Sequence, residues 1–158
     1  MLTVSQLRQN ASQLTQGESR PVSILSTNAT LQNKTLTIKA EARGTKLYPM
    51  VITFYNVDFS LDKDGSHPLH VRPKLGEPFF MSPVSEGVNP VQIRCACPRF
   101  RFAFAHWDKQ AKALLGPAFP TYIRKTQTRP EINPQHIPGV CKHILAFFDR
   151  LNRDKILA

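Results

Sequence analysis

Three cysteines and one histidine stand in two short pairs in the second half of the sequence. Cys95 and Cys97 form a Cys-x-Cys pair, and Cys141 and His143 form a Cys-x-His pair after a spacer of 43 residues, 98 to 140. Thiolate and imidazole groups are the ligands that Zn²⁺ prefers in tetrahedral protein sites, and four of them complete such a site. The spacing therefore predicts one zinc site, structural rather than catalytic, that ties the C-terminal half of the chain together.

Two other interpretations of these residues stay open. His136 could replace His143 as the fourth ligand, although its proline-rich surroundings offer a less fixed geometry. The cysteines could instead be three buried thiols, because cysteine is commonly buried without any ligand role. A disulfide framework is the weaker alternative, since the number of cysteines is odd and all of them lie in the last 64 residues.

The sequence offers no catalytic arrangement around these residues. A Cys/His hydrolase needs a nucleophile, a base and an orienting third group, and a catalytic zinc keeps one position for water. Asp62, Asp64 and Gly65 stand in a calcium-loop-like order, but the other oxygen ligands and the closing Glu are missing. We expect an Asp-Gly turn there, no small-molecule substrate and no enzymatic activity.

A strand and a helix must position the two ligand pairs. Residues 34–59 contain two alternating stretches around the turn-like RGTK and predict a β-hairpin. A further strand carries Cys95 and Cys97, and its period of two places both thiols on one face. The amphipathic helix predicted from about 142 to 156 has its apolar residues at i, i+3, i+4 and i+7: Ile144, Phe147, Phe148 and Leu151.

The spacer between the two ligand pairs has two parts. Phe100, Phe102 and Phe104 alternate with Arg99, Arg101 and Ala103 before helical spacing begins around Trp107. Residues 116–140 hold five prolines and predict a long loop.

The expected fold is α+β, a small antiparallel sheet with a C-terminal helix, stapled by zinc. Residues 1–33 are polar with scattered apolar positions, and we expect an N-terminal arm whose order depends on neighbours. Residues 34–158 then form the zinc-stabilised domain, in which residues 91–151 make the zinc module and residues 116–140 an inserted loop.

Positive charge is concentrated around the cysteines. The chain carries a net charge of +10, and residues 92–143 hold nine Lys and Arg against two Asp and Glu. Such a patch suits either nucleic acid or an acidic protein partner. The candidate contact residues are five basic side chains within this segment: Arg99, Arg101, Arg124, Lys125 and Arg129.

The order Cys-x-Cys, spacer, Cys-x-His resembles the SWIM-type zinc finger over about residues 91–151. The spacer is longer than is usual for that family. The strings CACPRFRFAFA, PTYIRKTQTRPEINP and PGVCKHILAF also make the C-terminal half similar to small virion structural proteins of tailed, cyanophage-like bacteriophages. This resemblance implies a part of the particle, in the tail, baseplate or neck.

From these observations we expect a zinc-stabilised assembly protein of a virion that acts through contacts with other virion proteins, in a homo- or hetero-oligomeric assembly. The alternative is a nucleic-acid-binding SWIM-type zinc finger. The sequence has no signal-peptide pattern and no run of about 18 apolar residues. We therefore expect no membrane contact, and assembly in the host cytoplasm.

Overall fold

The structure of this chain is a computed structural model that describes residues 1–14, 22–120 and 133–158. The fold is α+β, as the sequence predicts. The described elements are, in chain order, α1 (Val4–Leu14), β1 (Ser23–Gln32), β2 (Thr35–Arg43), β3 (Leu47–Phe54), β4 (Phe59–Ser60), β5 (Leu69–Val71), β6 (Phe79–Met81), β7 (Val91–Cys95), the π-helix η1 (Phe100–Phe104), α2 (Ala105–Gln110) and α3 (Lys142–Arg153).

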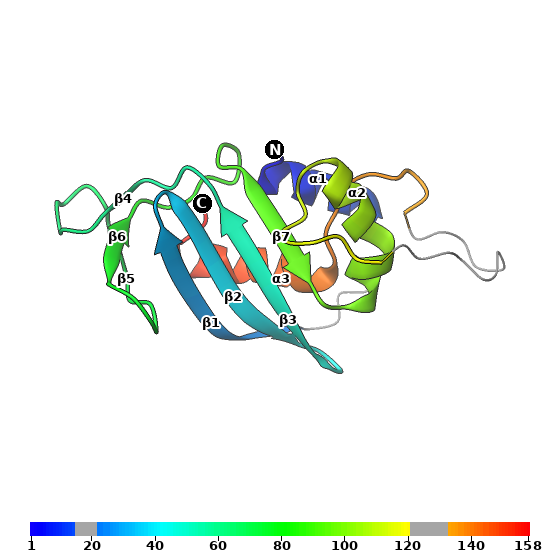
Figure 1. The fold of residues 1–158 in the computed structure, drawn as a ribbon, viewed down its shortest axis with the longest axis horizontal. Helices are drawn as coiled ribbons and strands as arrows, with labels where there is room; N and C mark the ends of the chain where they lie inside the picture. The colour runs from blue at the N-terminus through cyan, green and yellow to red at the C-terminus, as the bar shows by residue number, and fades with distance from the viewer. Residues whose placement is uncertain (15–21, 121–132) are drawn as a thin grey trace.

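Four antiparallel strands form the main sheet in the order β1-β2-β3-β7 (Figure 1). The register of β2 and β3 pairs Leu36 with Phe54 and Ile38 with Ile52, and all four side chains are buried. Directly paired residues point to the same face of a sheet, so this register gathers the apolar side chains of both strands on one face. The hairpin predicted within residues 34–59 is confirmed.

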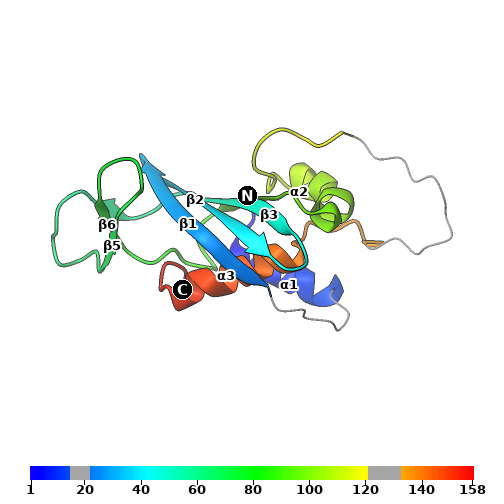
Figure 2. The same ribbon diagram turned by 90° about the horizontal axis from the view of Figure 1, so that it is seen from below.

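Helices α1 and α3 lie against one face of the main sheet (Figure 2). Their buried side chains join those of the sheet in a single core: Val4, Leu7 and Ala11 from α1, and Ile144, Phe147, Phe148 and Leu151 from α3. The C-terminal helix begins where the sequence predicts but ends at Arg153 rather than near residue 156. Lys155 there has a left-handed φ of 63°, which stops the helix.

Residues 1–33 differ from the expected polar arm, because their described parts belong to the fold. Thr3 and Gln6 form a reciprocal cap at the start of α1, in which the Thr3 N–H donates to Gln6 Oε1 at 2.9 Å. Strand β1 pairs with β2 from Ser23 to Gln32, with an irregularity between Leu25 and Asn28. The few apolar side chains of α1 are therefore enough to dock the helix, because they are buried in the same core as those of α3 and the sheet.

The segment that follows Cys97 is helical rather than extended. Phe100 and Phe104 are buried, whereas Phe102 keeps 49% of its surface exposed. The two buried rings are four residues apart, which is a helical spacing, although the alternation of Phe and Arg in the sequence suggests a strand. Helix α2 follows directly and ends at Gln110, after which Leu114 pairs with Ile93 of β7.

A second, three-stranded sheet of order β4-β6-β5 lies at one end of the molecule (Figure 1). The loop before β5 contains the expected Asp-Gly turn, in which Gly65 has a φ of 78° and Asp64 Oδ1 accepts a hydrogen bond from the Ser66 N–H. In the described part of the chain, the helices are all too short or too polar to cross a membrane.

Candidate metal centre

Strand β7 and the bend after it carry the first pair of candidate ligands. Val91, Ile93 and Cys95 are buried on one face of β7, as period two predicts. The strand ends at Cys95, but the Ala96 N–H still donates to the Pro49 carbonyl at 3.1 Å. Cys97 is also buried, and its Sγ accepts a hydrogen bond from the Phe100 N–H at 3.3 Å. The start of η1 thereby fixes the second thiol.

The start of α3 carries the second pair. Cys141 is the N-cap residue in an extended conformation, and His143 lies in the first turn of the helix. The approach to Cys141 is held by Asp108 of α2, whose Oδ1 accepts a hydrogen bond from the Gly139 N–H at 2.8 Å. Asn133 supports the same segment, because its Nδ2 donates to the Ala103 and Ile137 carbonyls. The helix η1–α2 thus orients the second pair toward the first.

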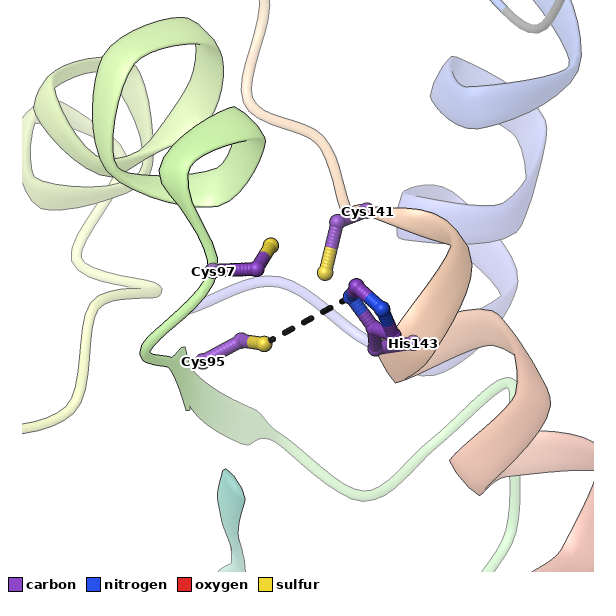
Figure 3. A group of neighbouring side chains, drawn as sticks. All are labelled: Cys95, Cys97, Cys141 and His143. Atoms are coloured by element: carbon purple, nitrogen blue, oxygen red, sulfur yellow. Dashed lines mark hydrogen bonds between the residues drawn. The ribbon is translucent and has the colours of Figure 1, made fainter. Parts of the chain in front are cut away.

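The four side chains converge on one point (Figure 3). All four are buried, and their ligand atoms lie within 4.8 Å of one another. Cys95 Sγ lies 4.0 Å from His143 Nδ1. A tetrahedral Zn²⁺ would hold such atoms about 3.5 to 3.8 Å apart, given its usual bond lengths. The cluster could therefore hold a metal ion after small side-chain movements.

The electrostatics of the cluster favour a cation. Hydrogen bonds with Cys141 and then with Cys95 hold the pKa of Cys97 well below its usual value. Burial, followed by the hydrogen bonds with Cys95 and Cys97, raises the pKa of Cys141 well above its usual value. The cluster thus favours one thiolate stabilised by protonated neighbours. A divalent cation would replace those protons, as metal binding to thiols generally does.

The other predicted residues are placed as follows. His136 is not among the clustered side chains, and its ring stacks on Trp107 at a centroid distance of 4.3 Å. Arg99 and Arg101 are exposed, and the Arg101 guanidinium lies 5.3 Å from the centre of the Phe102 ring. The remaining three candidate contact residues lie outside the described residues: Arg124, Lys125 and Arg129.

The sequence did not indicate two supporting residues. Tyr48 of β3 lies against the candidate ligand His143, with ring centroids 5.2 Å apart. Asp108 supports Gly139, two residues before Cys141. Neither is adjacent to a candidate ligand in sequence, and Asp108 stands before Lys109 and Gln110, a polar run that is typical of an exposed helix face.

A pocket of about 130 Å³ opens beside the cluster. Cys97, Cys141 and His143 line its inner part, together with Tyr48. Four exposed residues line the rest: Thr45, Pro98, Arg99 and Lys142. The candidate metal centre therefore lies next to a part of the surface that carries two positive charges, those of Arg99 and Lys142.

Comparison with known proteins finds no matching family model, curated protein or solved structure.

Proposed function

We propose that Cys95, Cys97, Cys141 and His143 bind one Zn²⁺ and that this site is structural. The observation that carries the proposal is the closed ligand set, four buried side chains that meet from the end of β7 and the start of α3. Three thiols and one imidazole match the preference of Zn²⁺ for sulfur and nitrogen ligands. When bound, the ion supplies a rigid link between two segments 43 residues apart in sequence.

The same ligand set argues against catalysis at this centre. Protein side chains fill all four positions of a tetrahedral ion, whereas a catalytic zinc keeps one position for water or substrate. A structural zinc contributes on the order of 10 to 16 kcal/mol of metal-linked folding free energy in small domains. The ion would therefore act through the stability of the fold rather than in catalysis, and the function proposed for this chain is not enzymatic.

We further propose that the chain is an assembly protein of a tailed-bacteriophage particle, in its tail, baseplate or neck. The support is the resemblance of three sequence strings in its C-terminal half to small virion structural proteins, to which the comparisons with known proteins add nothing. A buried structural centre is also compatible with this role, because it would leave the exposed surface for contacts with partners. The protein would act there through contacts with other virion proteins.

Two matched variants test the metal site. His143→Ala should lower the affinity for Zn²⁺ by more than about 100-fold, beyond the effect typical of outer-shell partners. His136→Ala should leave it unchanged, because the His136 ring stacks on Trp107 outside the cluster. Elemental analysis of the unaltered protein should give about one zinc per chain. Equal zinc losses in the two variants would reject this ligand set.

The place in the particle needs a separate experiment. An antibody raised against the recombinant chain should label purified particles of the phage that encodes it in immunogold electron microscopy. Mass spectrometry of the same particles should detect the chain at a constant ratio to other tail proteins. A chain that is abundant in the lysate but absent from purified particles would refute the virion role.

Nucleic-acid binding is the second candidate function. Phe102 exposes about half of its surface, 49%, and lies beside the Arg101 guanidinium. An exposed ring next to a cation is the combination on which unpaired bases stack. Saturable binding of single-stranded DNA at physiological salt, abolished by Phe102→Ala with Arg101→Gln, would favour this function over the first.

A further inference from the structure

Two basic side chains line the pocket beside the candidate metal centre, and two more stand close to a lining residue in the sequence. Arg99 and Lys142 line the pocket themselves. Thr45, in the turn between β2 and β3, also lines the pocket, and it stands between Arg43, the last residue of β2, and Lys46. We name the four residues Arg43, Lys46, Arg99 and Lys142 the cationic rim. They belong to three segments of the chain, each of which contributes a lining residue to the pocket.

The charge of the cationic rim is not neutralised within the described residues. All four side chains are exposed, and none of them forms an ion pair with a described residue. This contrasts with Arg8 and Arg150, which pair with carboxylates. Folding therefore gains little from the four rim charges, and a partner that carries opposite charge would gain from them.

The metal centre itself accounts for only a small part of this charge. In the proposed site, Zn²⁺ carries +2 and three thiolates carry −3, so that the centre has a net charge of −1 with a neutral imidazole. Arg99 and Lys142, which line the pocket, carry +2 and already exceed that charge, and Arg43 and Lys46 add a further +2 on the neighbouring segment. The rim therefore carries more positive charge than is needed to balance the net negative charge of the proposed zinc site.

The shape of the site favours a protein over a nucleic acid. Proteins that bind single strands combine a groove that follows the phosphates with aromatic rings on which bases stack. Here Arg99 and Lys142 line one small pocket of about 130 Å³. Its aromatic residue, Tyr48, already lies against the candidate ligand His143. A single carboxylate-bearing side chain suits this pocket better than a row of phosphates.

We propose that the pocket and its cationic rim bind an acidic segment of a partner protein, with one carboxylate held by Arg99 and Lys142. This inference rests on the proposed function, because it names the chemistry of the partner at the metal end of the molecule. Charge complementarity of this kind mainly sets partner choice and the rate of association.

The test uses the zinc-loaded full chain and a terminally blocked decapeptide of alternating Asp and Glu, measured by isothermal titration. The double variant Arg99→Gln with Lys142→Gln should bind the peptide about tenfold more weakly or worse. The matched control is Lys63→Gln with Lys74→Gln, which removes the same charge from two exposed lysines in the loops of the three-stranded sheet. That sheet lies at the end of the molecule opposite to α2 (Figure 1). The control should bind within about twofold of the unaltered chain.

Each outcome of this titration either supports or overturns the inference. Selective loss in the rim variant, with zinc content unchanged in both variants, supports the inference. Equal losses in both variants would mean that only net charge matters, and would overturn it. Tighter binding of a 20-base DNA strand than of the peptide, lost in the rim variant, would also overturn it in favour of nucleic acid. Zinc content, measured on the same samples, separates failure of the metal site from failure of the docking proposal.

Discussion

Asp108 has a buried carboxyl group that holds the segment before the candidate ligand Cys141. Its Oδ1 accepts the Gly139 N–H, whereas its Oδ2 has no hydrogen-bond partner among the described residues. Burial raises the pKa of this carboxyl well above its usual value. The folded state therefore binds a proton that the unfolded state releases above a pH of about 4. Stability consequently falls as the pH rises from about 4 toward the raised pKa.

Two substitutions of Asp108 separate its charge from its hydrogen bond. Asp108→Asn keeps an oxygen acceptor for Gly139 and removes the charge, so it should match or exceed the unaltered chain in stability at pH 8. Asp108→Leu leaves the buried Gly139 N–H without its acceptor and should cost about 1 to 3 kcal/mol. Urea denaturation of the zinc-loaded proteins at pH 5 and pH 8 measures both effects. An Asn variant as unstable as the Leu variant at pH 8 would contradict this account.

At the residue scale, the sequence predicts which residues are candidate metal ligands, but not which residues hold those ligands in place. The residues Cys95, Cys97, Cys141 and His143 could be singled out because their types and spacing are rare in combination, and the structure brings all four together. Tyr48 and Asp108 could not be singled out, because their roles depend on tertiary contacts with His143 and Gly139. A polar residue in a helix gives no sequence signal that tertiary packing will bury it.

At the element scale, Arg8 connects α1 to two other parts of the fold. Its Nε donates to Glu86 Oε1 at 2.7 Å, and its Nη1 and Nη2 donate to Asp149 and Asn152 of α3. The guanidinium also lies over the Phe148 ring, 5.4 Å from the centroid. This fork-shaped group makes three directed hydrogen bonds at once, which a lysine ammonium on a flexible chain cannot reproduce.

Arg8→Lys should therefore loosen α1 from α3 although the charge is kept. We expect a loss of about 1 kcal/mol in the free energy of unfolding, because the ion pairs are partly exposed and solvent screens them. Hydrogen exchange of the α1 amides should increase more than that of the sheet. Arg153→Lys, an exposed position without an ion pair among the described residues, is the control. Identical exchange in both variants would show that Arg8 does not hold α1 in place.

The elements that the sequence predicts well are those with one strongly apolar face. The hairpin, β7 and α3 show a clear period because the core covers one side of each. Helix α1 has a narrow stripe, and its docking depends on contacts with distant residues such as Glu86 and Phe148. The π-helix η1 was missed because Phe and Arg alternate through it, although burial follows the spacing of Phe100 and Phe104.

At the scale of the whole molecule, a metal ion in the proposed site would link the end of β7 to the start of α3. Removing the ion from the proposed site should take away metal-linked folding free energy of up to about 10 to 16 kcal/mol and lower Tm by about 10 °C or more. Hydrogen exchange should rise first at the end of β7, in η1 and at the start of α3, which carry or fix the ligands. Differential scanning calorimetry before and after chelation measures the shift, and re-addition of Zn²⁺ should reverse it. An unchanged Tm in a protein shown to have lost its zinc would refute the structural role.

The position of the rim residues next to the candidate ligands would couple zinc binding to the proposed binding of a partner. Arg99 follows Cys97 by two residues, and Lys142 immediately follows Cys141. An ion bound in the proposed site would therefore also fix the positions of these two charges at the same pocket. A chain that has bound zinc would present them to the proposed partner in one geometry, and a chain without zinc would bind that partner more weakly. Zinc binding would then precede assembly.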